Sequence, residues 1–462
     1  MRIAADLALV LAGLALLVAL GLALPALALG PAELASGRAR AQAIAMAGAV
    51  GLLVNHAAGL LFDDLRAVLV ACSVVALAGL GWAAARSGLL RTLFRLGWAR
   101  WLVALAILLL FCGPILFEPL HAWDARSIWF FQAKRIYFDG GLKIPGGWPN
   151  VAYGFSHIDY PKLLPLLAAQ FAQALGVWNE YVPKASLMAL LAPLVFGLLG
   201  AMRQVSAGLV LLALALLLGG RELLWNGYTD AYLAAYAGVS LIYFGRWLAQ
   251  REPLDLSCGI VFAGVMLNLK NEGTLFAACV GAGLVALAPV TRRAVRAGRL
   301  PAAVWLSLLL ALTGFGVWTA IKFHWGAQSD LQLGLGTVAR ISERISDGTL
   351  GVVAVSLLWQ PGLVTAFAVF VLMALLTSAT GRRPGAAACF PALVAALYAL
   401  GIFAIYLGTP HDLRWHLATS ADRTLLVAMC GFFASAFLML ADLELTQGQA
   451  VARPAGEMEL QA

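Results

Sequence analysis

The sequence contains little charge for its length. Of its 462 residues, 12% are charged and 62% are hydrophobic, and the mean hydropathy is +0.88. A soluble domain usually carries about twice that share of charged residues. The shortage of charge excludes an ordinary soluble protein and indicates a polytopic membrane protein.

Other patterns are missing as well. The apolar runs are continuous and rich in Leu, Ala and Val, without the alternating segments of an outer-membrane barrel. Because unpaired backbone groups are costly in lipid, we expect an all-α helix bundle. The six cysteines show no CxxC spacing and fall in apolar runs, so we expect buried packing residues and neither a disulfide nor a zinc site. There is no internal repeat of the transporter kind and no low-complexity linker.

Apolar runs predict 13 membrane spans, with 12 to 14 as the expected range, since a span needs roughly 20 apolar residues. The first run is longer than the apolar core of a signal peptide, so we interpret it as a retained span. The predicted spans lie near 3–29, 42–61, 66–85, 101–117, 184–201, 204–220, 226–245, 256–269, 273–290, 301–321, 351–377, 386–407 and 423–441.

Positive charge predicts the orientation of these spans. Arginines gather in five short connections, at Arg38 and Arg40, from Arg86 to Arg100, at Arg246 and Arg251, from Arg292 to Arg299, and at Arg382 and Arg383. The positive-inside rule places all five in the cytoplasm, so the net charge of +8 reports orientation and does not suggest nucleic acid. Three long segments then lie outside, at 118–183, 322–350 and 408–422. The apolar stretch 161–176 could be a further span, but we favour a helix that lies at, or dips into, the outer interface.

Polar residues gather in five stretches at the predicted outer face. They supply Asp124 and Arg126 in the first stretch; His157, Asp159, Tyr160 and Lys162 in the second; Tyr228 and Asp230 in the third; Lys270, Asn271 and Glu272 in the fourth; and His411, Asp412, Arg414, His416, Asp422 and Arg423 in the fifth. Together they predict one polar cavity at that face.

Ordinary structural roles would explain several of these residues. Helix capping would account for Asp159 and Asp230, and Lys270 with Glu272 could form a self-neutralising pair. The aromatics Trp123, Trp129, Phe130 and Phe131 are typical of an interfacial belt. Asp124 is harder to explain, because a carboxylate at the lipid boundary is costly without a partner, for which Arg126 is the nearest candidate.

The combined chemistry favours work on a lipid-linked phosphate. Carboxylates can act as a base, and cations can bind a phosphate. Apolar spans beside them can hold a lipid tail. A carboxylate pair could also hold a divalent metal ion, which the sequence does not decide.

Four motifs resemble a known family. "WDARSIWFFQAKRIYFDGG", "SHIDYPKLLPLLAAQFAQALG", "LKNEG" and "TPHDLRWHLATSADRTLL" resemble the WDA…KA and SHPDYPLLLP patterns, and two further signatures, of bacterial integral-membrane glycosyltransferases. These belong to the GT-C superfamily, related to protein O-mannosyltransferases and lipid A aminoarabinose transferases. The resemblance covers roughly 105–275 and 400–441. It therefore implies a GT-C catalytic core at 101–290, C-terminal helices at 291–441 and a short cytoplasmic tail at 442–462, with 1–100 unassigned.

The resemblance implies an inverting glycosyltransferase at the periplasmic face of a bacterial inner membrane. The donor would be a polyprenyl-phosphate sugar, on an undecaprenyl carrier, and the acceptor a lipid or glycan hydroxyl. By motif, Asp124 is the general base. Candidate phosphate-binding cations are Arg126, Lys162, Lys270 and Arg414, and Asp159 and Asp230 would position sugar or acceptor. The alternatives are a transporter or flippase of a lipid-linked sugar, and a non-catalytic lipid-binding scaffold.

Overall fold

Every regular element that the structure describes is a helix, which confirms the all-α prediction. The structure, a computed structural model, describes residues 2–22, 33–85, 89–143, 147–148, 150–296, 300–327, 329 and 335–451. The second part of the first predicted span (23–29), Arg86, Arg299 and the end of the predicted tail (452–462) lie outside these residues.

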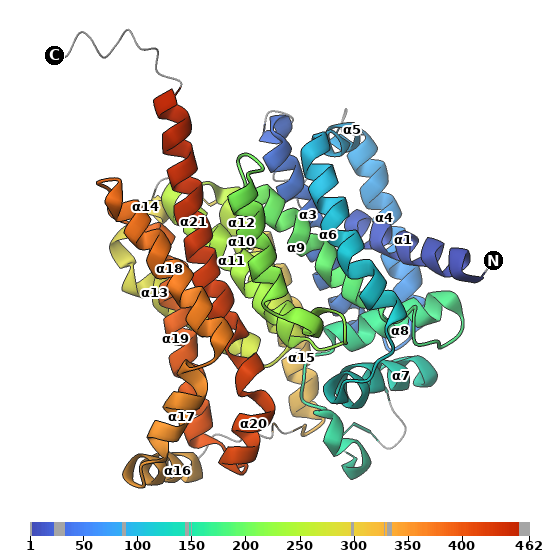
Figure 1. Cartoon of the computed structure of the whole chain (residues 1–462). Helices are drawn as coiled ribbons and strands as arrows, with labels where there is room; N and C mark the ends of the chain where they lie inside the picture. The colour runs from blue at the N-terminus through green and yellow to red at the C-terminus, as the bar shows by residue number, and fades with distance from the viewer. Residues whose placement is uncertain are drawn as a thin grey trace, which may run out of the picture.

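The elements up to the centre of the chain are numbered as in Figure 1. They are α1 (Arg2–Gly21), η1 (Glu33–Ala35), α3 (Gly37–Leu61), α4 (Leu65–Ala85), α5 (Leu89–Phe94), α6 (Trp98–Phe117), the π-helical turn η2 (Ala125–Trp129), α7 (Phe130–Asp139), η3 (Val151–Ser156), α8 (Leu163–Leu175), α9 (Ala185–Ala201), α10 (Ala207–Leu218), η4 (Arg221–Leu224) and α11 (Asp230–Gln250).

The remaining helices complete the bundle. They are α12 (Pro253–Leu269), α13 (Glu272–Ala286), α14 (Ala288–Arg296), α15 (Ala302–His324), α16 (Leu335–Ser346), α17 (Thr349–Leu358), α18 (Pro361–Ala379), α19 (Ala386–Gly408), α20 (Leu413–Thr424) and α21 (Leu426–Val451). Since α21 continues to Val451, the first half of the predicted tail is helical.

Seven of the described helices are long and apolar enough to cross a membrane, or eight if α13 and α14 form one bent span. Their composition is that of a multi-pass membrane protein. Other predicted spans correspond to shorter apolar helices, such as the 12 residues of α10 and the 17 of α12. The predicted count of 13 therefore exceeds the number of helices that qualify by length and composition.

The predicted span 351–377 is two helices, α17 and α18. Pro361 begins α18, and the preceding Gln360 has an extended backbone with φ −66° and ψ 123°. A proline disfavours helical conformation in the residue before it, so the apolar run cannot continue as one helix.

The apolar stretch 161–176 forms a short helix, α8, that packs against several helices of the bundle. Its 13 residues extend about 20 Å at 1.5 Å per residue, which is less than the roughly 30 Å of a bilayer core. Residues Leu163 to Ala172 are all buried, and α8 contacts α3, α4, α7 and α9. It is therefore a short helix that other helices cover, and it is too short to cross a bilayer alone.

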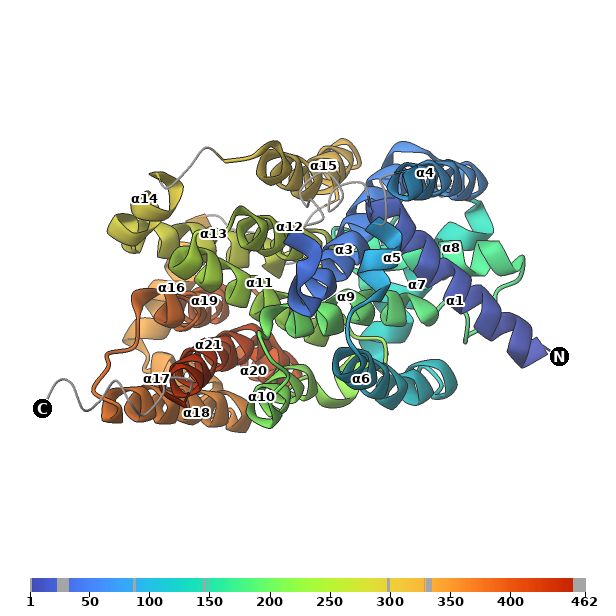
Figure 2. The same cartoon turned by 90° about the horizontal axis from the view of Figure 1, so that it is seen from above.

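The long helices run side by side, with α11 near the centre (Figures 1 and 2). Every residue of α11 from Asp230 to Leu248 is buried, and the helix contacts α9, α12, α19 and α21. In Figure 1, α7, α8, α16 and α20 lie at the lower end of the bundle, whereas α5 and the end of α21 lie at the upper end. In both views α1 runs across the bundle.

Hydrogen bonds at a constant register join α11 to α9. The hydroxyls of Tyr236 and Tyr243 donate to the carbonyls of Leu190 and Gly197, at 2.9 and 2.8 Å. The Arg246 guanidinium donates to the carbonyl of Gly200 at 3.0 Å. Each pair is separated by 46 residues, so the two helices run parallel and their first residues lie at the same end of the bundle.

Candidate functional site

Five ionisable side chains from five segments form a row at the lower end of the bundle. Asp124 precedes the turn η2, and Arg423 lies in the last turn of α20. Asp230 is the first residue of α11, Lys270 follows α12, and Glu272 begins α13. Each therefore stands at a helix end, where an apolar run gives way to polar sequence.

The charges alternate along this row, which we call the charge row. The Arg423 guanidinium forms an ion pair with the Asp124 carboxylate and lies 3.7 Å from Oδ2 of Asp230. The Lys270 ammonium is 2.8 Å from Oδ1 of Asp230 and 2.8 Å from Oε1 of Glu272. Asp124, Asp230, Lys270 and Glu272, which the sequence placed at one face, thus lie together.

The row is partly exposed at both ends and buried in the middle. The Asp124 and Arg423 side chains are 18% and 17% exposed, and Glu272 at the other end is 20% exposed, whereas Lys270 and Asp230 are 8% and 5% exposed. A buried charge is tolerated when it is paired, and both inner groups are. We call the end formed by Asp124 and Arg423 the open end, because both of its charged side chains are partly exposed, and a ligand that enters there meets a carboxylate and a guanidinium together.

Aromatic rings cover the cations. The Arg423 guanidinium lies 4.9 Å from the ring centre of Tyr228, and the Lys270 ammonium lies 5.7 Å from that of Tyr160. Tyr160 stacks between His157 and Trp129, with ring centres 4.9 and 5.5 Å apart. Tyr228, Tyr160 and His157, all predicted site residues, are thus beside the row.

The turn after Asp124 is π-helical, from Ala125 to Trp129. Such turns are rare and occur frequently at functional sites. Here the turn directs Trp129 and Phe130 inward, where they are 1% and 4% exposed. The predicted interfacial belt is therefore wrong for these two rings, while Trp123 is 74% exposed, as a belt residue would be.

Asp159 contacts Asn271, which belongs to the fourth polar stretch (Lys270, Asn271 and Glu272), and it does not cap α8. Its Oδ2 accepts a hydrogen bond from the Asn271 amide at 2.6 Å, and helix α8 begins later, with Lys162 at its N-cap position. Burial raises the pKa of Asp159, although the Asn271 hydrogen bond and the nearby Lys162 charge oppose the rise. Helix capping is the alternative structural role for Asp230, but its side chain forms an ion pair with Lys270. The residue at the N-cap of α11, Thr229, makes no side-chain hydrogen bond to the helix.

Lys162 is enclosed and does not face the opening. Its ammonium donates to Oε1 of Gln132 and to the carbonyl of Ile158, both at 2.8 Å. It also lies 4.7 and 4.6 Å from the ring centres of Trp148 and Trp318. Burial lowers the pKa of Lys162 to about 7. The prediction that Lys162 contacts a phosphate is therefore not supported by its position.

The other predicted residues lie apart from the row. Arg126 and Arg414 are exposed, and within the described residues no ion pair joins either side chain to Asp124. Asp412 caps α20 by accepting from the Trp415 amide at 2.8 Å. The rings of His411 and His416 lie together, and Nδ1 of His416 is 3.0 Å from the hydroxyl of Thr409.

Arg423 is the member of the row to which the sequence assigned no role. At about 100° per residue, positions nine apart lie on opposite faces of a helix. Arg414 and Arg423 therefore cannot both face the bundle. His416 and Ser420 interact with Tyr406 of α19, and Arg423 follows them at helical spacing, so the phase of α20 is the signal that favours Arg423.

No group of three or more His, Cys, Asp or Glu side chains suited to a metal ion occurs among the described residues. In the charge row, cations stand between the carboxylates. The row as it stands therefore has the arrangement of an ion-pair network and not that of a carboxylate metal site.

Comparison with protein-family models, with curated proteins and with solved structures finds no match to this chain.

Proposed function

We propose that the protein is an inverting glycosyltransferase that moves a sugar from a polyprenyl-phosphate donor to a hydroxyl of a lipid or glycan acceptor. The observation that carries the proposal is the open end of the charge row, where a carboxylate and a guanidinium meet. The reaction needs a base for the acceptor and a cation for the departing phosphate. The open end supplies both beside apolar helices.

Asp124 would act as the general base. An alkyl hydroxyl is a weak nucleophile until a positioned group accepts its proton, a gain of about 10²–10⁴-fold. As the acceptor oxygen bonds to the anomeric carbon, its proton passes to the Asp124 carboxylate. The bond from that carbon to the phosphate oxygen breaks, and the polyprenyl phosphate leaves with the electron pair. Attack from the side opposite the leaving group inverts the anomeric centre.

Arg423 would bind the donor phosphate, with Lys270 behind it. Arg423 is paired with Asp124 at the open end, so an incoming phosphate can take over the guanidinium and free the carboxylate for the acceptor. Charge-assisted bonds to a guanidinium are strong and often bidentate, and they gain strength as the leaving phosphate collects charge. Lys270 is held between two carboxylates, which makes it the weaker candidate.

The proposal includes the finer architecture that the sequence suggests. We place the shorter apolar helices other than α8 in the bilayer with the long ones, giving 12 to 14 spans in a GT-C arrangement. Arg246 and Arg251 lie at the end of α11 far from Asp230, and Arg383 follows α18, which ends at the upper end of the bundle, opposite the charge row (Figure 1). By the positive-inside rule this supports a bacterial inner-membrane protein whose site faces the periplasm.

Reconstitution tests the proposal. The purified full chain is incorporated into vesicles with a labelled polyprenyl-phosphate sugar and a pool of membrane-lipid acceptors. We expect transfer of label to the acceptor by the wild type and a loss of at least about 10²-fold in Asp124→Asn, because the amide cannot accept the proton. The matched control is Asp422→Asn, which removes an exposed carboxylate at the same end and should leave transfer unchanged.

Other outcomes would point to the rival functions. Transfer at the wild-type rate in Asp124→Asn would contradict the assigned mechanism. Label that crosses the bilayer without transfer would favour a flippase, although the charge row stands at helix ends and not at the centre of the bundle, where transporter sites lie. Binding of the donor with neither transfer nor crossing would favour a scaffold.

A further inference from the structure

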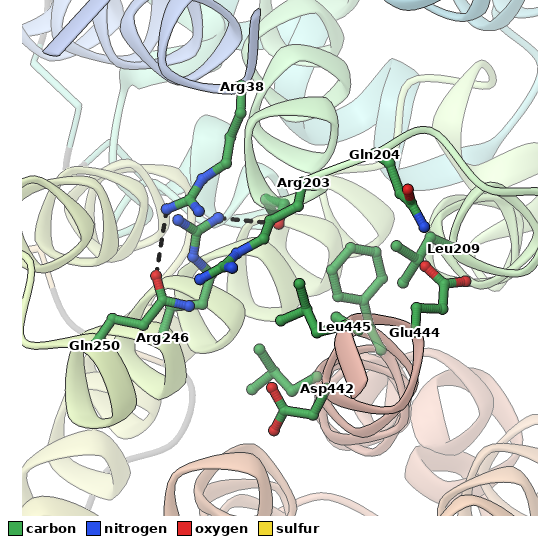
Figure 3. Close-up of a pocket in the computed structure, with 13 residues that line it drawn as sticks. Arg38, Arg203, Gln204, Leu209, Arg246, Gln250, Asp442, Glu444 and Leu445 are labelled. Atoms are coloured by element: carbon green, nitrogen blue, oxygen red, sulfur yellow. Dashed lines mark hydrogen bonds between the residues drawn. The ribbon is translucent and has the colours of Figure 1, made fainter. Parts of the chain in front are cut away.

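Two adjoining cavities lie at the end of the bundle opposite the charge row. Their volumes are about 320 and 850 Å³, and both are bordered by Arg38, Arg203 and Gln250. Small-molecule sites usually occupy about 300–1,000 Å³. The smaller cavity, between α9, α11 and α21, is drawn in Figure 3.

Three guanidinium groups converge on the smaller cavity. Figure 3 shows the side chains of Arg38, Arg203 and Arg246 directed toward one another from three different segments. Arg246 is paired within the protein, because it lies 3.0 Å from the Asp255 carboxylate and donates to the carbonyls of Gly200 and Ala201. Asp255 therefore offsets the charge of Arg246.

The other two guanidiniums have little compensation. Arg38 reaches Oε1 of Gln250 at 3.4 Å and the Asp255 carboxylate only at 4.0 Å. The Arg203 side chain makes no ion pair or hydrogen bond within the described part of the chain. Arg203 is exposed, so solvent screens part of the repulsion between the two cations, and an anion between them would remove the remainder.

The acidic residues on the opposite wall compensate Arg203 only in part. Glu444 of α21 accepts a hydrogen bond from the Ser206 hydroxyl at 2.6 Å. The charge of the exposed Asp442 acts on Arg203, but no ion pair joins either carboxylate to Arg203 among the described residues. Arg38 and Arg203 thus keep donors directed into the cavity.

The backbone that carries Arg203 is fixed from both sides. Arg100 donates to the carbonyls of Met202 and Arg203, at 3.1 and 2.8 Å, and Arg246 holds the two preceding carbonyls at 3.0 Å. The end of α9 is therefore satisfied by two guanidiniums. A preorganised group loses less entropy when it binds a ligand.

A buried hydroxyl lines the larger cavity. Ser257 is 1% exposed, and its Oγ has no hydrogen-bond partner among the described residues. An unpaired buried hydroxyl is unfavourable, so such groups usually have a partner. A bound ligand would supply one.

We propose that these cavities bind a phosphate group, with the guanidiniums of Arg38 and Arg203 as the main contacts and the Ser257 hydroxyl as a further donor. Guanidinium matches a phosphate with paired, charge-assisted hydrogen bonds. The phosphate could belong to an anionic lipid headgroup or to a soluble compound, and the chemistry of recognition is the same. The site is separate from the charge row and does not depend on the proposed transferase activity.

Thermal unfolding of the full-length protein tests the site, because a ligand that binds the folded state raises the unfolding temperature. One arm adds inorganic phosphate to protein in neutral detergent. The other compares protein in nanodiscs of phosphatidylcholine with and without phosphatidic acid. We expect a concentration-dependent rise in one arm, and binding at least about tenfold weaker in Arg203→Gln, since charge-assisted hydrogen bonds are stronger than neutral ones.

Two further variants complete the design. Arg293→Gln removes an exposed arginine outside the cavities and should bind as the wild type does. Ser257→Ala removes a buried hydroxyl with no partner, so it should not lower the ligand-free unfolding temperature and should raise it slightly, while phosphate binds more weakly.

A rise with inorganic phosphate assigns a soluble ligand, and a rise with phosphatidic acid alone assigns a lipid headgroup. No rise in either arm, or an equal rise in Arg203→Gln, would overturn the proposal.

Discussion

Arg423 is the residue that connects the charge row. It pairs with Asp124 and lies 3.7 Å from Asp230, and the two carboxylates come from different segments. Asp230 is only 5% exposed, so it depends on its cations to offset the cost of burial.

Replacing Arg423 should destabilise the protein. Arg423→Gln leaves Asp124 without its partner and Asp230 with Lys270 alone. Because Arg423 itself is 17% exposed, we expect a loss of about 2 kcal/mol, below the 3–5 kcal/mol of a fully buried pair. Thermal unfolding in detergent measures the loss. Asp422→Asn, its exposed neighbour, should change stability by less than about 0.5 kcal/mol; equal effects in the two variants would show that the row does not stabilise the fold.

Lys162 should make stability depend on pH. Its pKa is about 7 in the folded protein and about 10.4 in an unfolded chain. Between these values the unfolded state binds more protons, so the free energy of unfolding rises with pH, by about 2 kcal/mol from pH 7 to pH 9. Unfolding midpoints across this range should rise in the wild type and less steeply in Lys162→Gln. Lys134→Gln, at an exposed lysine, should keep the wild-type slope, and a wild-type slope in Lys162→Gln would refute the assignment.

For single residues, the sequence identifies the charged side chains of the row but not the partners with which they form ion pairs. Asp124, Asp230 and Lys270 stand out because each charge adjoins an apolar run. The partner of Asp124 is 299 residues away, while Arg126, two residues away, is exposed. Proximity along the chain predicts the wrong pair, because partners here are set by how helices pack.

Helix packing explains how the row is assembled. The constant register between α9 and α11 fixes them as parallel neighbours. Helix α10, which lies between them in the sequence, must therefore run in the opposite direction. This brings the start of α11, with Asp230, to the end where Lys184 at the start of α9 donates to the carbonyl of Glu118. Glu118 follows α6 and leads to Asp124, so the same contacts position two members of the row.

A glycine at a helix contact should be essential to this arrangement. A Cβ at Gly200 would lie 2.7 Å from the backbone nitrogen of Gln42 and 2.8 Å from the Tyr243 hydroxyl. Backbone cannot yield as a flexible side chain does, so Gly200→Ala should cost about 1–3 kcal/mol as α9 and α3 separate. Gly316→Ala, in α15 where a Cβ meets nothing within 4 Å, should be neutral or slightly stabilising. Unfolding midpoints compare the two, and similar values would contradict the close packing.

Element boundaries follow from the sequence less well than element type. The apolar runs identify nearly every long helix, because continuous hydrophobicity is a strong signal. Hydrophobicity alone does not show the 89° bend between α13 and α14 or the break before Pro361. It also does not distinguish a short helix buried in protein, such as α8, from one that lies in lipid.

Charge divides the whole molecule into two ends. One end carries the alternating row, in which most charges are paired within the protein. The other carries arginines in short connections, including Arg203, which keeps unpaired donors. The apolar helices of the bundle separate the two charged ends. This polarity could be predicted from the sequence, because it depends only on the order of runs and loops.

The same polarity predicts which side of a membrane each end faces. Glu180 lies in the exposed loop before α9, near the charge row, and Arg383 lies in the exposed connection after α18. In intact cells a membrane-impermeant maleimide should label Glu180→Cys, whereas Arg383→Cys should be labelled only after the membrane is opened. The native cysteines are buried or half-buried, and the unsubstituted chain measures their background. If Arg383→Cys were labelled in intact cells and Glu180→Cys were not, the row would face the cytoplasm. A polyprenyl-linked donor presented outside could then not reach Asp124, so the labelling tests the location of the site independently of any transfer assay.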